Sequence, residues 1–335
     1  MIYDMTTSNE SFINMRMFLK KQKIINNAFF LTLLDEDLIG INPRDPNLTD
    51  VQKRKIIAEC KNNYWYFLRE IVRIPDIGTD EGVSYPLNRG TLAFNFCLEN
   101  DFSAMVDLPT QVNKYLTMDI RLLWEYLMRD NSKAVIFDNN YGDALKHLNF
   151  IIKSSYRLLP DYLKIKDICE DKTKYIRSGG SVINIGKKAK TNIEAENIGG
   201  SLTHNRQVFC DFSNLKYNEK IFSSSRQPYS ISSKNAFKDG IPFGTIVLTN
   251  GGNISTKPGK FAYTVKELSQ KFDESFYDWD IEHLKDLGNR SCHPMFYITF
   301  NLLDLQKSYD WITQRIKLMN YNWTEFMRDG FTTWI

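Results

Sequence analysis

The sequence predicts an α/β fold in which helices flank a mainly parallel sheet. Through the middle of the chain, short apolar segments alternate with longer segments of helical periodicity, as the strands and crossover helices of a parallel sheet do. The apolar segments 207–210 and 245–248 are followed by Asp211 and Thr249, and polar residues at strand ends are typical of the ligand-binding edge of such a sheet. With 335 residues, 42% of them hydrophobic, the chain can bury one large domain with a smaller appendage, or two domains.

The first 60 residues are predicted to form a small helical lead-in. They are polar and rich in Asn and Lys, with helical segments at 18–30 and 51–60. Thr49 and Asp50 are residue types that cap helices, and they stand immediately before the second segment.

The next segments lead to a central strand, loop and helix. Aromatic and apolar residues at helical spacing predict a core-facing helix over 62–74. Segment 77–90, with three glycines and a proline, is predicted to be a loop, and 91–98 to be a helix. Segment 104–106 is predicted to be a strand, and about four apolar helical turns follow Lys114. The predicted apolar face of the first helix contains Tyr64, Phe67, Leu68 and Ile71.

The order of strand, loop, lysine and buried helix is the outline of a phosphate-binding loop. In such a loop the backbone N–H groups and the helix N-terminus hold an anion, and the lysine reaches the outer phosphates. The motif has glycine before the lysine and serine or threonine after it, which holds Mg²⁺. This chain has Asn113 and Tyr115 at those positions. On sequence alone, Lys114 is either a phosphate ligand or a solvated lysine at a helix N-terminus.

The remaining segments continue the alternation. Segment 133–137 is predicted to be a buried strand and 141–159 an amphipathic helix that a proline ends. Segment 175–185 is predicted to form two short strands turned by a glycine pair, and 302–319 a C-terminal helix.

Overall charge does not decide whether the chain binds nucleic acid. The net charge of +3 and the isoelectric point near 8.4 neither demand nor exclude DNA, so any contact must come from a local patch. The basic residues Lys187, Lys188 and Lys190 are either a solvated loop or a contact for DNA phosphates.

Cysteine usage favours a reducing compartment. The five cysteines are scattered and lack CxxC spacing, which argues against a disulfide framework or a zinc site and predicts reduced thiols. The four histidines also lack metal-ligand spacing, so they are assigned no chemistry. Neither a secretory signal nor an apolar run of about 18 residues is present. The cysteines are Cys60, Cys97, Cys169, Cys210 and Cys292, and the histidines are His147, His204, His283 and His293.

Several ordered blocks resemble the ATPase domain of the large terminase subunit of tailed bacteriophages, specifically the versions from very large and gut-associated phages. The resemblance covers roughly residues 60–335 and rests on the blocks NNYWYFLREIVRIP, YPLNRGTLAFNF, LLPDYL, GIPFGTIVLTNGG, PGKFAYTV and ESFYDWD. It implies a P-loop NTPase-like domain at 61–300 after the lead-in 1–60. A C-terminal helical segment at 301–335 then ends where a nuclease domain would begin, so no DNA cleavage is expected from this chain.

The resemblance implies a nucleotide site at Gln111, Asn113, Lys114 and Tyr115. The family's P-loop resembles PRQxGKT or PRQxGKS, whereas this chain reads PTQVNKY over 109–115. The proline, glutamine and lysine are kept. The arginine, the glycine and the hydroxyl that would bind Mg²⁺ are replaced.

The other motifs implied by the resemblance are also altered. Asp211 matches the aspartate that supports Mg²⁺, although from the residues alone it is equally a helix cap or a surface carboxylate. Phe212 replaces the glutamate that activates water, and an aromatic ring cannot act as a general base. The coupling motif is reduced to Thr249 followed by Asn250, and an arginine–glycine step appears as glycines at 199–200.

Two functions follow from this pattern. The first is a motor subunit that drives DNA into the prohead with a divergent ATPase site, which borrows groups from a neighbouring chain. The second is a non-catalytic pseudo-ATPase that serves as a structural or interaction partner of the packaging machinery or DNA. Because losing one preorganised group costs on the order of 10²- to 10³-fold in rate, we expect weak or absent nucleotide binding and little hydrolysis.

By resemblance, the cofactors are ATP and Mg²⁺, both of which the altered motifs call into question. The implied partners are portal, other terminase subunits and double-stranded DNA, in a homo- or hetero-oligomer on the prohead and without a membrane. The implied location is the host cytoplasm.

Overall fold

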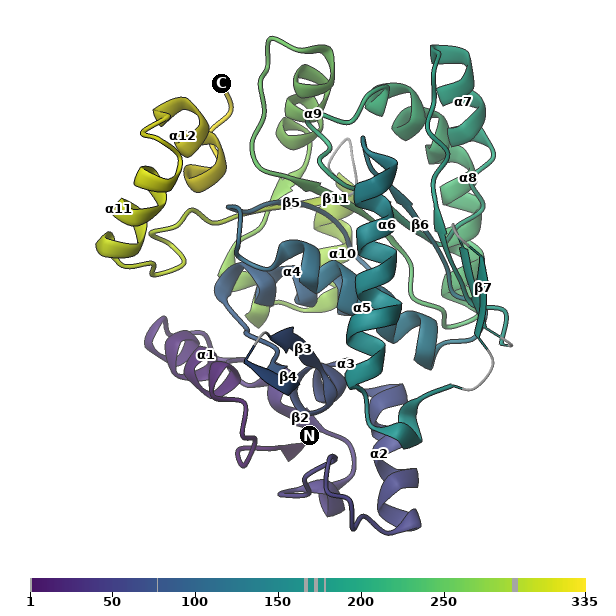
Figure 1. Cartoon of the computed structure of the whole chain (residues 1–335), viewed down its shortest axis with the longest axis vertical. Coiled ribbons are helices and arrows are strands. Elements are labelled where there is room, and N and C mark those ends of the chain that lie inside the picture. The colour runs from purple at the N-terminus through teal and green to yellow at the C-terminus, as the bar shows by residue number, and fades with distance from the viewer. Residues whose placement is uncertain (1, 77, 166–167, 172–173, 178, 291–294) are drawn as a thin grey trace.

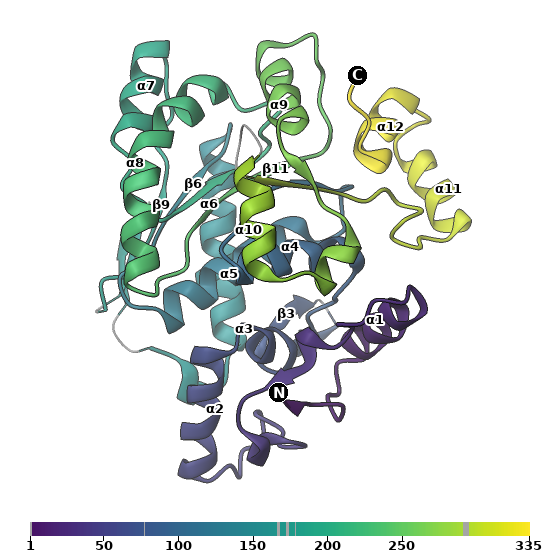
Figure 2. The ribbon, with the colours of Figure 1, turned by 180° about the vertical axis from the view of Figure 1, so that it is seen from behind.

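A nine-stranded sheet with helices packed around it forms the centre of the molecule (Figures 1 and 2). The computed structural model describes residues 2–76, 78–165, 168–171, 174–177, 179–290 and 295–335. Seven neighbouring strands are parallel, and the last two continue the sheet in antiparallel fashion. The predicted mainly parallel α/β fold is therefore confirmed. In sheet order the strands are β12 (Gln270–Lys271), β13 (Met295–Thr299), β5 (Ser103–Asp107), β11 (Gly244–Thr249), β10 (Arg206–Phe209), β6 (Lys133–Phe137), β9 (Val182–Ile185), β8 (Lys174–Arg177) and β7 (Ile168–Asp171).

The helices and two small hairpins complete the fold. Strand β1 (Ile2–Tyr3) pairs with β2 (Thr32–Leu33), and β3 (Arg73–Asp76) pairs with β4 (Thr79–Ser84). The α-helices are α1 (Glu10–Lys21), α2 (Asp50–Asn62), α3 (Tyr64–Tyr66), α4 (Arg89–Glu99), α5 (Lys114–Met128), α6 (Tyr141–Asn149), α7 (Asn192–Gly200), α8 (Asn218–Lys238), α9 (Lys257–Glu267), α10 (Ile281–Arg290), α11 (Tyr309–Leu318) and α12 (Trp323–Phe331). Helix α3 continues as a π-helical turn over Phe67–Ile71, and α6 as one over Phe150–Ser155.

Alternating side chains of the central strands fill two separate cores. Successive residues of a strand point to opposite faces of its sheet. In β5, the buried residues Ala104 and Val106 belong to the larger core, which also contains residues of α4 and α5. Met105 belongs to the second core, with residues of α7, α8 and α9. This two-sided burial explains why the central strands are continuous apolar runs in the sequence.

Helix α5 is fastened to the sheet by a buried ion-pair network. Glu125 accepts a hydrogen bond from the Arg206 guanidinium of β10 at 2.6 Å and one from Arg121 at 2.8 Å. All three residues are at most 1% exposed. The two arginines hold the pKa of Glu125 below its usual value, although burial opposes this shift. The network fixes the helix that begins at Lys114.

Most of the predicted elements are present. The predicted face of the aromatic helix, from Tyr64 to Ile71, is fully buried, and Thr49 caps α2 by accepting a hydrogen bond from the Gln52 N–H. The glycine-turned hairpin is formed by β8 and β9. The strands predicted at 104–106, 133–137, 207–210 and 245–248 correspond to β5, β6, β10 and β11, and the helices predicted at 91–98 and after Lys114 correspond to α4 and α5.

Three predicted elements were placed wrongly. The helix predicted at 18–30 ends at Lys21, and Lys23 follows in the left-handed region, which stops the helix. Segment 77–90 is not all loop, because β4 pairs with β3 around a bulge. The C-terminal helix predicted at 302–319 begins only at Tyr309, where the preceding serine accepts a hydrogen bond from the Trp311 N–H.

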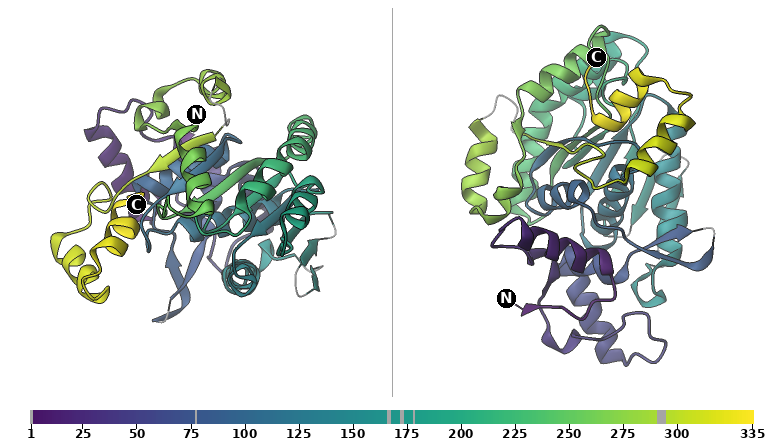
Figure 3. Two further views of the ribbon diagram at one scale, coloured as in Figure 1. Left: turned by 90° about the horizontal axis from the view of Figure 1, so that it is seen from above. Right: turned by 90° about the vertical axis from the view of Figure 1, so that its left-hand side faces the viewer.

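The two ends of the chain lie on different parts of the molecule. The N-terminal elements form its lower end in the right-hand view, and α11 and α12 lie on one flank above them (Figure 3). The buried residues Phe12 and Ile56 belong to the same core as Ala104 of the sheet. The division at residues 60 and 300 stays a prediction. No helix within the described ranges is both long enough and apolar enough to cross a membrane.

Candidate functional site at the carboxyl edge of the sheet

The central parallel strands end level with one another, and this alignment creates the site. Asp107 at the end of β5 is in register with Thr249 at the end of β11. Phe137 of β6 is in register with Phe209 of β10. Residues that follow these four strands therefore meet at one edge, where ligands bind in open α/β sheets.

The loop between β5 and α5 keeps the backbone shape of a phosphate-binding loop without glycine. Gln111 and Asn113 both have φ of +68°, in the left-handed region that glycine enters without strain. Asn113 is the N-cap of α5, yet its side chain makes no capping hydrogen bond. The Thr110 N–H donates to the Asp329 carbonyl at 3.1 Å, so the C-terminal segment lies against this loop.

Lys114 is turned into the protein and is 2% exposed. Its ammonium group donates to the Leu108 carbonyl at 2.5 Å and to the Thr249 carbonyl at 2.6 Å. It also donates to the side-chain oxygen of Asn250. Burial lowers the pKa of Lys114 to about 8, while the nearby Asp107 carboxylate opposes the shift. All three donor positions of the ammonium group are thus directed at protein oxygens.

Asp107 ties the loop to the C-terminal segment. Its carboxylate accepts hydrogen bonds from the Gly251 N–H at 2.6 Å, the Tyr297 hydroxyl at 2.8 Å and the Trp334 indole N–H at 2.9 Å. Burial raises the pKa of Asp107. The Ile335 N–H donates to the Gly252 carbonyl at 2.9 Å, so the last residues pair with the segment that follows β11.

Tyr115 occupies the place where the family has a small hydroxyl residue. Its ring stacks on the His147 imidazole of α6, with ring centres 5.2 Å apart and planes 25° from parallel. Its hydroxyl lies against the backbone of Asp211, and burial raises the pKa of Tyr115. The tyrosine therefore closes the gap between α5 and α6 and presents its oxygen at the end of β10.

The residues after β10 have the character expected from the sequence. Asp211 has φ of +46° and accepts a hydrogen bond from the Asn214 side chain at 2.9 Å. Burial raises the pKa of Asp211. Phe212 is fully buried in the second core, with ring centres 5.5 Å from Phe222 and 6.0 Å from Phe261. No water activator is available at position 212.

A pocket of about 450 Å³ lies in front of these strand ends. Its cations are all paired with carboxylates: Lys146 with Asp143 at 2.6 Å, Arg328 with Asp329 at 2.8 Å and His147 with Asp119 at 3.1 Å. Its two further carboxylates, on Asp138 and Asp211, have no cation within ion-pair distance among the residues that the structure describes. The pocket as described therefore attracts cations rather than phosphates. Its lining consists of Tyr115, Asp138, Asp143, Lys146, His147, Asp211, Ser213, Asn214, Asn250, Gly251, Arg328 and Asp329.

These residues do not fit a nucleotide bound in the manner of a P-loop. The ammonium group of Lys114 is held by protein oxygens, the hydroxyl of Tyr115 comes from an aromatic ring, and the open carboxylates repel phosphate. Asp211 alone retains a position for Mg²⁺. Accordingly we derive no hydrolysis step for this site.

The remaining predicted site residues are placed as follows. Thr249 and Asn250 contact Lys114 directly, so the strand-end residues expected to share one location do so. Lys187, Lys188 and Lys190 are exposed between β9 and α7, and their contact with DNA stays a prediction. The glycine pair at 199–200 ends α7. Cys60, Cys97 and Cys210 are free and buried, whereas the side chains of the other two cysteines lie outside the described part of the chain.

Sequence reasoning missed the residues that close the site. Asp107, Tyr297 and Trp334 come from three distant segments, and no local spacing connects them. The only signal in the sequence is the carboxylate at the end of the β5 apolar run, which resembles the polar ends of β10 and β11.

Comparisons with known proteins support the fold. No protein-family model matches the sequence, and no curated protein matches it. Among solved structures, a mutant of the large terminase ATPase domain of Thermus phage P74-26 is similar over 75% of this chain and 95% of that chain, with a TM-score of 0.52 and 11% identity. The unmutated domain has a TM-score of 0.47 at 12% identity over the same shares. The large terminase of another, thermophilic bacteriophage has a TM-score of 0.45 at 10% identity, over 75% of this chain and 54% of that chain.

The likeness with the higher TM-score shows that this chain has the fold of a large terminase ATPase domain. At 11% identity it establishes the fold and not the activity.

Proposed function

Because the chain has the fold of a large terminase ATPase domain, we propose that it is a terminase-like subunit of a phage DNA-packaging machine. The ordered sequence blocks that resemble this family support the role, together with a fold likeness over 75% of the chain. In this role the chain acts with portal, other terminase subunits and double-stranded DNA, in an oligomer on the prohead. Its nucleotide site is divergent and impaired.

The observation that carries the impairment is the position of Lys114. A P-loop lysine must be free to reach the outer phosphates. Here the residue is 2% exposed and its ammonium group already donates to three protein oxygens. Nucleotide binding through Lys114 would first have to break these charge-assisted hydrogen bonds, which are worth about 1.5–3 kcal/mol each.

A second candidate, the non-catalytic partner, is favoured by the charge of the pocket. A motor that borrows a cation from a neighbouring chain would still present Asp138 and Asp211 to the phosphates. It would also still lack a base, because Phe212 is enclosed by aromatic rings. We therefore favour a subunit that keeps the ATPase fold for contacts with DNA or packaging proteins.

Nucleotide titration tests the impairment. The purified chain is titrated with Mg²⁺-ATP by calorimetry, beside Lys114→Ala and the pocket-surface control Lys146→Ala. We expect no saturable heat at millimolar ATP for any of the three proteins, and no ATP turnover. Micromolar binding that Lys114→Ala alone abolishes would contradict an impaired site.

The packaging role is tested separately, by binding to DNA and to portal rings. The triple change Lys187→Glu, Lys188→Glu and Lys190→Glu should weaken binding to a DNA duplex and reduce the slope of log affinity against log salt by roughly three. A matched change of three exposed lysines at the end of α1 and just beyond, Lys20, Lys21 and Lys23, should leave both values near wild type. Absence of binding to DNA and to portal would refute the role whatever the nucleotide result.

A further inference from the structure

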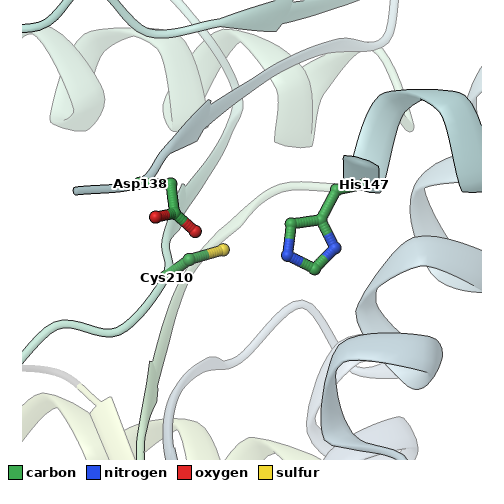
Figure 4. Close-up of side chains that lie close together, drawn as sticks. All are labelled: Asp138, His147 and Cys210. Carbon is green, nitrogen blue, oxygen red and sulfur yellow. The ribbon is translucent and has the colours of Figure 1, made fainter. Parts of the chain in front are cut away.

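Three side chains with metal-binding atoms meet at the edge of the pocket. Asp138 follows β6, Cys210 follows β10, and His147 lies on α6, which packs beside these strands. One carboxylate oxygen, one ring nitrogen and the thiol sulfur all lie within 4.8 Å of one another. In Figure 4 the imidazole of His147 faces both the Cys210 thiol and the Asp138 carboxylate.

The backbone holds two of these residues at the same level. β6 and β10 are parallel neighbours with Phe137 opposite Phe209, and the Cys210 N–H donates to the Phe137 carbonyl at 2.8 Å. Asp138 and Cys210 are therefore fixed side by side by the sheet itself, not by flexible loops. A preformed pair of this kind lowers the ordering cost of binding a ligand.

The orientation of the third residue is also fixed. His147 Nδ1 lies 3.1 Å from the Asp119 carboxylate of α5, and the ring is stacked on Tyr115. With Nδ1 directed at Asp119, the other ring nitrogen is the one that faces the cluster (Figure 4). A carboxylate behind a histidine is the usual support of a metal-binding imidazole, because it fixes the ring and raises its basicity.

We propose that Asp138, His147 and Cys210 bind Zn²⁺. Thiolate and imidazole are ligands that Zn²⁺ prefers, whereas Mg²⁺ takes oxygen ligands. Zinc bonds of about 2.0–2.3 Å place tetrahedral ligand atoms about 3.3–3.8 Å apart, so the three atoms need to approach by about 1 Å, which side-chain rotation supplies.

Three protein ligands leave one coordination position open. Asp138 and His147 also line the pocket of about 450 Å³, so this position faces solvent and takes water or an added ligand. On binding, the Cys210 thiol loses its proton to solvent, and the facing ring nitrogen of His147 must be unprotonated. The Zn²⁺ site does not depend on the proposed packaging role.

Metal titration tests the site on the purified full chain, freed of metal by a chelator and carrying no histidine tag. Co²⁺ is used as the probe because a cobalt–thiolate bond gives a charge-transfer absorption band in the near ultraviolet, and Zn²⁺ is then added to displace it. We expect one Co²⁺ per chain, a thiolate band, and complete displacement by Zn²⁺.

Matched variants assign the ligands. Cys210→Ser should abolish the band and weaken Zn²⁺ binding at least tenfold, whereas Cys97→Ala, which removes another buried thiol, should leave both unchanged. Asp138→Asn, a change at the pocket surface, should weaken Zn²⁺ binding at least tenfold while circular dichroism stays that of the wild type. Absence of a saturable band in the wild type, or a band and affinity that survive both Cys210→Ser and Asp138→Asn, would overturn the proposal.

Discussion

Replacement of Lys114 by methionine separates a structural lysine from a ligand-binding one. The ammonium group donates to Leu108, Thr249 and Asn250, and hydrogen bonds to charged groups contribute about 1.5–3 kcal/mol each. Their sum is roughly 5–9 kcal/mol before the cost of burial. Burial lowers the lysine pKa from 10.5 to about 8, which corresponds to about 3 kcal/mol against the charged form. We therefore expect Lys114→Met to lower the free energy of unfolding by about 2–5 kcal/mol.

The assay is urea unfolding at pH 7, followed by circular dichroism. Lys146→Met is the control, because Lys146 lines the same pocket but is exposed, and its midpoint should equal that of the wild type. If Lys114→Met unfolded at the wild-type urea concentration, the ammonium group would not be holding the strand ends together. The account of Lys114 as an internal clamp would then be wrong.

Three further predictions concern the same region. Glu125→Ala leaves Arg121 and Arg206 buried without their shared carboxylate, so it should lower the free energy of unfolding by about 3–5 kcal/mol in urea titrations; a loss under about 1 kcal/mol would contradict the network. Asn113→Ala should destabilise by roughly 1 kcal/mol because alanine tolerates the left-handed region poorly, whereas Asn113→Gly should be close to neutral; equal effects would show that the loop does not keep φ of +68°. Because burial lowers the pKa of Lys114 to about 8 from 10.5, the unfolded chain binds more protons than the folded chain between these two pH values. The free energy of unfolding should therefore rise with pH in this range in the wild type relative to Lys114→Met, and parallel pH profiles would refute the shift.

The fold could be predicted because its signals are local. Buried parallel strands are continuous apolar runs, and β5, β6, β10 and β11 were found from that property alone. The strand β4 was missed because it is half exposed and carries Gly82 with φ of +69°, so its composition is that of a loop. Helix α8 was missed because its apolar residues are spread thinly and Pro228 lies within it.

The site could be predicted only in part. Lys114, Asp211, Thr249 and Asn250 could be located at one edge from the sequence, since each follows or precedes a recognisable element. That the lysine would donate to Thr249 and Asn250 could not be foreseen, because both interpretations of Lys114 place it at the start of a helix. Cys210 and His147 lie on separate elements far apart in the chain, and spacing rules detect metal ligands only when they lie close in sequence.

The charge of the pocket connects these findings. A phosphate loop attracts anions because its lysine and backbone N–H groups are unpaired. In this chain Lys114 is paired internally, and Lys146, Arg328 and His147 are each paired with a carboxylate. Asp138 therefore faces the pocket without a cation partner among the described residues. Pairing the cations is sufficient to change the ligand of this edge from an anion to a cation, and the parallel sheet that positions the residues does not have to change.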